Sequence, residues 1–284
     1  MESKDLFFAD ADSSFDKAQF VILGVPFDGT CSFRKGARFA PKSIREESYN
    51  LETYLFDHDI DLEDVPFHDL GDVKCESLEN MMGGVGRSVG DILEKGKFPI
   101  IIGGEHSLTP PSVRKFENVG VIILDAHLDF RDEYLEERNS HACATRRVSE
   151  LVGIENVLTI GVRSMEKKEK EEGDKLGLKY IDASKLKKLG IKKALENIEW
   201  KSIYLSIDMD FFDPSYAPGV GNPEYFGLSP LDAKECIDIL APRLVGFDIT
   251  EVSPPFDNGN TSSLAARLIR EVIAVVWKAH KKLK

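Results

Sequence analysis

The chain has 284 residues, and its 49 acidic against 37 basic side chains give a formal net charge of −12 at pH 7. This balance argues against a nucleic-acid or anionic-membrane partner and suits a cationic ligand. The start of the chain lacks a secretory signal, no apolar run approaches the roughly 20 residues of a membrane span, and the four scattered cysteines indicate reduced thiols. We expect a cytoplasmic protein in which residues 1–284 form a single domain.

The first half of the chain alternates apolar runs with amphipathic segments. Runs at residues 20–25, 65–70, 98–102 and 121–124 predict buried strands. A helix is expected from Lys42, because the preceding proline favours a first helical turn, and another over residues 77–97, where apolar side chains recur at helical spacing.

The second half continues this pattern. Strands are predicted at residues 156–162, 178–181, 203–210 and 243–249, and helices at 183–196, 229–240 and 262–282. Strands that alternate with helices are typical of a parallel, doubly wound sheet.

Two of the predicted strands end in alternating polar residues. The run at 121–124 leads into D-A-H-L-D, and the run from residue 203 closes in D-M-D. If the backbone stays extended past Leu124, alternate side chains point to one side, and the carboxyl ends of parallel strands meet at one crevice. The candidate metal ligands are Asp125, His127 and Asp129 from the first stretch and Asp208 and Asp210 from the second.

A sixth candidate ligand, His106, follows the strand at 98–102 within G-G-E-H-S. Taken alone, such a histidine or a single D-x-D favours a structural role at a strand end. Carboxylates crowded together without a cation would be strongly destabilising, so the whole set favours metal binding.

Six ligands are too many for one ion and suit two ions that share bridging carboxylates. Mostly carboxylate ligands with some imidazole and no thiolate favour Mn²⁺ over Zn²⁺ or Cu²⁺, and Mg²⁺ tolerates imidazole poorly. Two such ions can hold a shared water as hydroxide, which indicates a hydrolase. The sequence contains neither a phosphate-binding glycine motif nor a G-x-S-x-G nucleophile motif.

Several motifs together carry a resemblance to a known family. They are G-G-E-H-S, D-A-H-L-D, the pair Ser140 and His141, the long segment 206–223 and D-I-T-E-V-S-P-P. In order and spacing the chain resembles the ureohydrolase family of arginases and agmatinases over nearly its whole length. The A-P-G within the long segment is more similar to agmatinases than to arginases.

The resemblance implies a three-layer αβα sandwich with a mostly parallel eight-stranded sheet, two Mn²⁺ ions and hydrolysis of a guanidino group by a hydroxide bound to both metals. It implies Asp125 and Asp208 as bridges, His141 as a proton shuttle, Asp129 as a proton relay and Glu251 as the acid that binds the guanidinium. It implies one ion held by His106, Asp125, Asp129 and Asp208, and the other by Asp125, His127, Asp208 and Asp210.

The substrate is inferred from charge. The loop before His141 carries Asp132, Glu133, Glu136 and Glu137 against two arginines, which should attract a cationic tail and repel a carboxylate. We therefore expect agmatine as substrate, with putrescine and urea as products. Aminopropylagmatine is the alternative nearest in chemistry, followed by arginine and guanidinobutyrate.

Other readings receive less support. A phosphoesterase with two metals should show basic residues near the ligands, and an inactive scaffold should have lost a bridge or the shuttle. Ala142 and Cys143 stand where the family commonly has glycine after the histidine, and Tyr225 and Phe226 replace a small pair, so the tail pocket is expected to differ. The family usually forms trimers or hexamers, and we expect a homo-oligomer.

Overall fold

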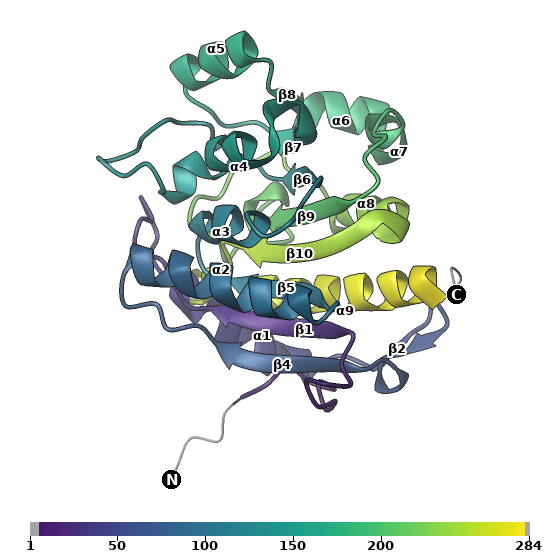
Figure 1. Ribbon diagram of the computed structural model, residues 1–284. Helices are drawn as coiled ribbons and strands as arrows, with labels where there is room; N and C mark the ends of the chain where they lie inside the picture. Colours follow the sequence, from purple (N-terminus) through teal and green to yellow (C-terminus); the bar gives the residue numbers. More distant parts are fainter. Residues whose placement is uncertain (1–5, 282–284) are drawn as a thin grey trace.

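The computed structural model describes residues 6–281 and is built around an eight-stranded sheet (Figure 1). All neighbouring strands in this sheet run parallel, so their carboxyl ends share one side of the molecule. In spatial order the strands are β4 (Phe67–Asp72), β1 (Phe20–Val25), β5 (Phe98–Gly103), β10 (Leu244–Thr250), β9 (Ile203–Asp208), β6 (Gly120–Leu124), β7 (Val157–Val162) and β8 (Lys179–Asp182).

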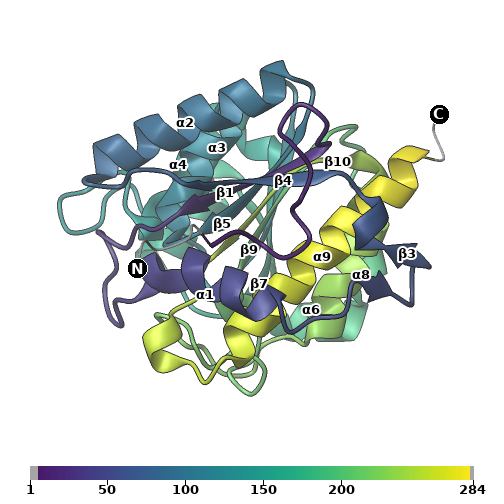
Figure 2. The same cartoon turned by 90° about the horizontal axis from the view of Figure 1, so that it is seen from below.

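Helices cover both faces of this sheet and complete three layers (Figure 2). One face carries α2 (Leu78–Glu94), α3 (Thr109–Val113) and α4 (Ala144–Val152), and the other carries α1 (Ala40–Ser48), α6 (Ala183–Leu189), α8 (Pro230–Leu240) and α9 (Asn260–Lys281). The other α-helices and strands within residues 6–281 are α5 (Lys167–Leu176), α7 (Ile191–Leu195) and an antiparallel pair, β2 (Tyr54–Leu55) with β3 (Ile60–Asp61).

Strand β5 illustrates why its sequence is apolar throughout. Ile100 and Ile102 belong to the same core cluster as Val272 of α9, whereas Ile101 belongs to the opposite cluster with Val85 of α2. Because alternate side chains point to opposite faces, a strand covered on both faces has no solvent-exposed positions. The expected doubly wound parallel sheet is therefore confirmed.

Most predicted elements are found within two or three residues of their expected ends, but one helix prediction was wrong. The segment 183–196 forms two helices, α6 and α7, because Gly190 adopts a φ of 79° between them, a backbone conformation that ends a helix. Helices α3, α4 and α5 and the β2–β3 pair were not predicted. The expected end of the last helix at Lys282 lies outside the described residues. Within residues 6–281, no helix is long and apolar enough to span a membrane.

Candidate metal centre and substrate cavity

The candidate ligands follow three strands at the centre of the sheet. His106 begins a 3-10 turn just after β5, Asp125 follows β6, and Asp208 is the last residue of β9. Glu251 follows β10, which lies between β5 and β9. The parallel arrangement thus brings segments that are far apart in the sequence to one crevice at the carboxyl ends of adjacent strands.

The segment after β6 does not stay extended. The prediction that Asp125, His127 and Asp129 point to one side of a continuous strand is therefore not met. Strand β6 ends at Leu124, and Asp129 adopts a φ of 48°, in the left-handed region that non-glycine residues seldom occupy. This turn directs the Asp129 carboxylate back towards His106. The side chains converge as expected, but a loop brings them together instead of a regular strand.

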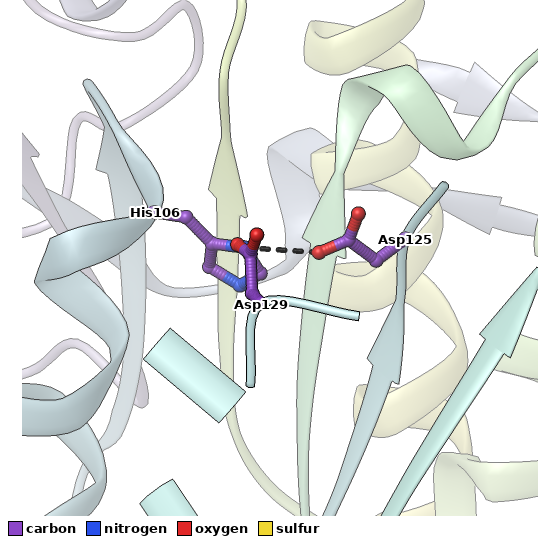
Figure 3. Close-up of side chains that lie close together, drawn as sticks. All are labelled: His106, Asp125 and Asp129. Atoms are coloured by element: carbon purple, nitrogen blue, oxygen red, sulfur yellow. Dashed lines mark hydrogen bonds and ion pairs between the residues drawn. The ribbon is translucent and has the colours of Figure 1, made fainter. Parts of the chain in front are cut away.

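His106 faces Asp125 and lies close to Asp129 in the first group of ligands (Figure 3). Its Nδ1 is 3.1 Å from Oδ2 of Asp125, 3.1 Å from Oδ2 of Asp129 and 3.4 Å from Oδ2 of Asp208. One nitrogen can donate only one hydrogen bond, and Asp125 Oδ2 has no hydrogen-bond partner among the described residues. A buried carboxylate oxygen without a donor, facing an imidazole and two more carboxylates, fits the position of a cation.

The opposite nitrogen of His106 is held by a second buried contact. Nε2 lies 3.2 Å from the hydroxyl oxygen of Ser206, and that hydroxyl donates a 2.6 Å hydrogen bond to Asp248. With Nε2 engaged in this way, Nδ1 is the nitrogen that faces the carboxylates. Partners behind a metal-binding histidine commonly fix its ring in this manner.

His127 lies in the second group of ligands. Its Nδ1 is 2.8 Å from Asp210 Oδ2 and 3.7 Å from Asp125 Oδ1, while its Nε2 is 3.5 Å from Glu224 Oε1. Asp125 therefore belongs to both groups, as a bridging ligand should. The two groups that could each hold an ion are His106 with Asp125 and Asp129, and His127 with Asp125 and Asp210.

The carboxyl groups of this cluster repel one another. Burial, followed by repulsion from Asp208 and Asp210, raises the pKa of Asp125 well above its ordinary value. Burial and the charge of Asp210 raise the pKa of Asp208 to about 7. Burial opposes ionisation of Asp210 as well, but the attraction of His127 outweighs it and lowers the pKa to about 2.

These shifts predict how pH affects metal binding. Because Asp125 and Asp208 have raised pKa values, the metal-free folded chain holds protons that the unfolded chain has released, so their contribution to stability falls as pH rises from about 4 through about 7. A divalent ion displaces these protons and removes the repulsion. The rise in Tm on adding manganese should therefore be larger at about pH 7.5 than at about pH 5.5. Thermal unfolding with manganese and with a chelator checks this, and an equal or smaller rise at the higher pH would contradict it.

A cavity of about 290 Å³ opens above the cluster. Glu251 lines it, is 7% exposed, and uses Oε1 to accept a 2.8 Å hydrogen bond from the backbone N–H of His106. Burial, then repulsion from Asp208 and Glu105, raises the pKa of Glu251 well above its ordinary value. A buried acid among other carboxylates favours a cationic partner in the cavity.

His141 lines the same cavity but is joined to a different set of residues. Its backbone N–H donates a 3.0 Å hydrogen bond to the hydroxyl of Thr30, which in turn contacts the buried Glu105. Thr30, Glu105 and Glu224 were not predicted as site residues. Glu105 lies within the recognised G-G-E-H-S motif and could have been found there, whereas nothing in the sequence near Thr30 pointed to the site.

The acids of the loop before His141 were expected to attract the cationic tail of the substrate, but the structure does not place them at the cavity. Asp132 pairs with Arg138 and Arg147, each at 2.9 Å, and neither it nor Glu137 is among the described residues that line the cavity. The acids from later segments that line it are Glu166, which pairs with Arg131 at 2.6 Å, and Glu169. The negative character of the cavity is retained, but other residues supply it.

Comparisons with known proteins agree with this geometry. A model of the arginase family matches residues 18–275. An agmatinase from Pyrococcus horikoshii is 36% identical, over 91% of this chain and 92% of its own. An N(1)-aminopropylagmatine ureohydrolase from Thermococcus kodakarensis is also 36% identical, over 93% of this chain and 92% of its own. The crystal structure of an agmatine ureohydrolase from Thermoplasma volcanium superimposes with a TM-score of 0.95 at 41% identity, covering 99% of this chain and 97% of the other.

Proposed function

The chain belongs to the arginase family, and from this premise we propose that it is an agmatinase, which hydrolyses agmatine to putrescine and urea with two bound Mn²⁺ ions. The observation that carries the proposal is the largely buried cluster of four aspartates and two histidines, of which His127 is the most exposed, beneath a cavity that Glu251 also lines. Cations relieve the repulsion within such a cluster, and the family supplies the reaction.

In this proposal the side chains that converge beneath the cavity would hold the two ions. Asp125 and Asp208 would be shared between the ions, and the donor set of oxygen atoms with two imidazoles suits manganese. When bound, the ion pair activates a water molecule as the nucleophile. The six proposed ligands are His106, Asp125, His127, Asp129, Asp208 and Asp210.

The residues around the cavity bind and orient the substrate. Glu251 can accept two parallel hydrogen bonds from a guanidinium, which directs the guanidinium carbon towards the cluster. Asp129, which lines the cavity, would accept a proton there during the reaction. His141, on the cavity wall, exchanges protons between solvent and the departing amine.

The charge of the cavity supports a cationic substrate. Among residues 6–281, six carboxylates and a single arginine line it. Even with two divalent ions bound, these carboxylates together with Asp125 outnumber the positive charges. A substrate with a carboxylate tail, such as arginine or guanidinobutyrate, is therefore less favourable than agmatine.

Aminopropylagmatine is the second candidate, because a relative that acts on it is as similar to this chain as an agmatinase is. Both substrates present a guanidinium to Glu251 and a cationic tail to the acidic mouth of the cavity. They differ in the length and charge of that tail.

A urea assay on the manganese-loaded protein tests the proposal. Agmatine, aminopropylagmatine, arginine and 4-guanidinobutyrate are compared at equal concentration. We expect agmatine to give the highest rate, with the two carboxylate-bearing substrates slower by at least about tenfold. Faster release from aminopropylagmatine or from arginine would reassign the substrate, and no urea from any of the four would overturn the proposed reaction. Size-exclusion chromatography of the same sample tests the expected homo-oligomer.

A further inference from the structure

A set of hydrogen bonds joins the loop after β1 to His141, and the proposed reaction assigns these contacts no role. Thr30, in the loop after β1, lies between the carboxylate of Glu105 and the imidazole of His141. These residues are 75 and 111 positions apart from Thr30 in the sequence. Their contacts decide which nitrogen of His141 carries a proton.

The hydroxyl proton of Thr30 is committed to Glu105. The hydroxyl oxygen lies 2.5 Å from Glu105 Oε1, the backbone N–H of Thr30 donates to Oε2 at 2.8 Å, and the hydroxyl of Ser107 donates to Oε1 at 2.6 Å. Glu105 is 1% exposed, and its two carboxylate oxygens accept these three hydrogen bonds. The Thr30 hydroxyl therefore donates here.

The same oxygen then acts only as an acceptor towards His141. It lies 3.0 Å from the backbone nitrogen of His141 and 3.2 Å from its ring Nδ1. A hydroxyl oxygen has two acceptor sites, so both contacts are satisfied only when Nδ1 carries a hydrogen. The ring of Tyr134, edge-on at 5.8 Å and 84°, packs against the imidazole and opposes a flip.

We propose that Thr30 is a positioning residue that holds His141 as the Nδ1–H tautomer, which leaves Nε2 as the nitrogen that exchanges protons in the cavity. Nε2 takes up a proton from the bulk solvent and its buffer, and the resulting imidazolium gives that proton to the departing amine, which returns the ring to its neutral form. The proton on Nδ1 stays in place throughout, so no ring rotation is needed between turnovers. This inference rests on the shuttle role proposed for His141.

The loop geometry at Glu105 supports a fixed arrangement. The backbone N–H of Gly104 donates to Val25 and that of Glu105 to Phe27, at 2.9 and 2.8 Å. A side chain on Gly104 would meet the carbonyl oxygen of Phe27 at 1.9 Å, so only glycine allows this close approach of the two loops. The close approach brings Thr30 within reach of Glu105.

Three variants test the inference. Thr30→Val keeps the backbone contact to Glu105 but removes the hydroxyl, and kcat should fall at least about tenfold with KM and manganese content unchanged. Thr30→Ser should restore kcat to within about threefold of the original. In the His141→Ala background, Thr30→Val should cause no further loss, because the two residues act as one unit.

The outcomes separate this inference from the proposed function. An unchanged kcat in Thr30→Val, no rescue by serine, or an equal loss in the His141→Ala background would overturn the role of Thr30. An unchanged kcat in His141→Ala would overturn the shuttle itself.

A second measurement does not depend on how the Thr30 variants fold. The measurement is ¹⁵N NMR of histidine-labelled protein loaded with zinc, which unlike manganese is not paramagnetic. The signals of His141 are those that are missing from the spectrum of the His141→Ala variant. We expect a protonated Nδ1 and an unprotonated Nε2 in the neutral ring. The opposite tautomer would refute the inference.

Discussion

Replacing Asp125 with asparagine is expected to abolish urea release and to reduce bound manganese to less than one ion per chain. Asp125 belongs to both groups of candidate ligands and is fully buried. An amide at this position can still accept the 2.6 Å hydrogen bond that Oδ1 receives from the backbone N–H of His127. It cannot bridge two cations, so activity should fall on the order of 1,000-fold or more. Elemental analysis and a urea assay measure the two effects.

The stability of the metal-free variant gives an independent test. Burial and neighbouring carboxylates disfavour the charge on Asp125, so Asp125→Asn should leave the metal-free protein as stable as the original or more stable. Adding manganese should then raise Tm much less than it does in the original. A variant that keeps two ions and full activity would contradict the bridging role.

Asp69 provides a matched control for this substitution. It is 2% exposed, and its carboxylate makes bonds of 2.7 and 2.9 Å to the buried guanidinium of Arg45. Asp69→Asn weakens a buried ion pair and should destabilise the fold by up to roughly 3–5 kcal/mol without changing manganese stoichiometry. The same chemical change is thus expected to have opposite effects on stability at the two buried aspartates.

The sheet could be predicted because its strands are buried on both faces and read as unbroken apolar runs. The helix break at Gly190 was missed because an isolated glycine is compatible with a helical pattern until the backbone conformation is known. Helix α5, K-K-E-K-E-E-G-D-K-L, was missed because its almost entirely charged sequence has no apolar stripe that predicts a helix.

The site was predictable where ligands directly follow strands. The position of Asp125 after β6 and of Asp208 at the end of β9 follows from the rule that parallel strands end at one crevice. The roles of His141 and Glu251 came from the family resemblance instead, because neither lies in a pattern that specifies its chemistry. Their placement on the cavity wall agrees with those roles and leaves them to be tested by substitution.

The contacts of Thr30 lie beyond what local pattern can predict. Two loops of different strands must approach closely before its hydroxyl meets Glu105 and His141, and that approach depends on tertiary packing around Gly104. The acids of the loop before His141 show the opposite case, because residues predicted at the cavity are not found there. Asp132, near His141 in sequence, pairs with Arg138 and Arg147 away from the cavity, while Glu166 from a later segment lines it.

Glu251→Gln is expected to remove guanidinium binding while sparing the metal cluster. The substitution preserves size, and the amide oxygen can still accept the 2.8 Å hydrogen bond from the His106 backbone. The amide nitrogen replaces an acceptor with a donor and removes the charge that pairs with the guanidinium. We expect kcat/KM for agmatine to fall about 100- to 1,000-fold, which corresponds to roughly 3–4 kcal/mol.

Two readouts decide whether Glu251 acts on the substrate or on the fold. Manganese content should remain at two ions per chain, because Glu251 is not a proposed ligand. Glu271→Gln is the matched control, since Glu271 is 3% exposed and pairs at 2.6 Å with both His58 and Arg267, outside the residues that line the cavity. That variant should lose stability but keep kcat/KM. Loss of manganese in Glu251→Gln would show that Glu251 belongs to the metal cluster. An unchanged kcat/KM would show that another residue orients the guanidinium. The preference for cationic substrates would then come from the overall charge of the cavity.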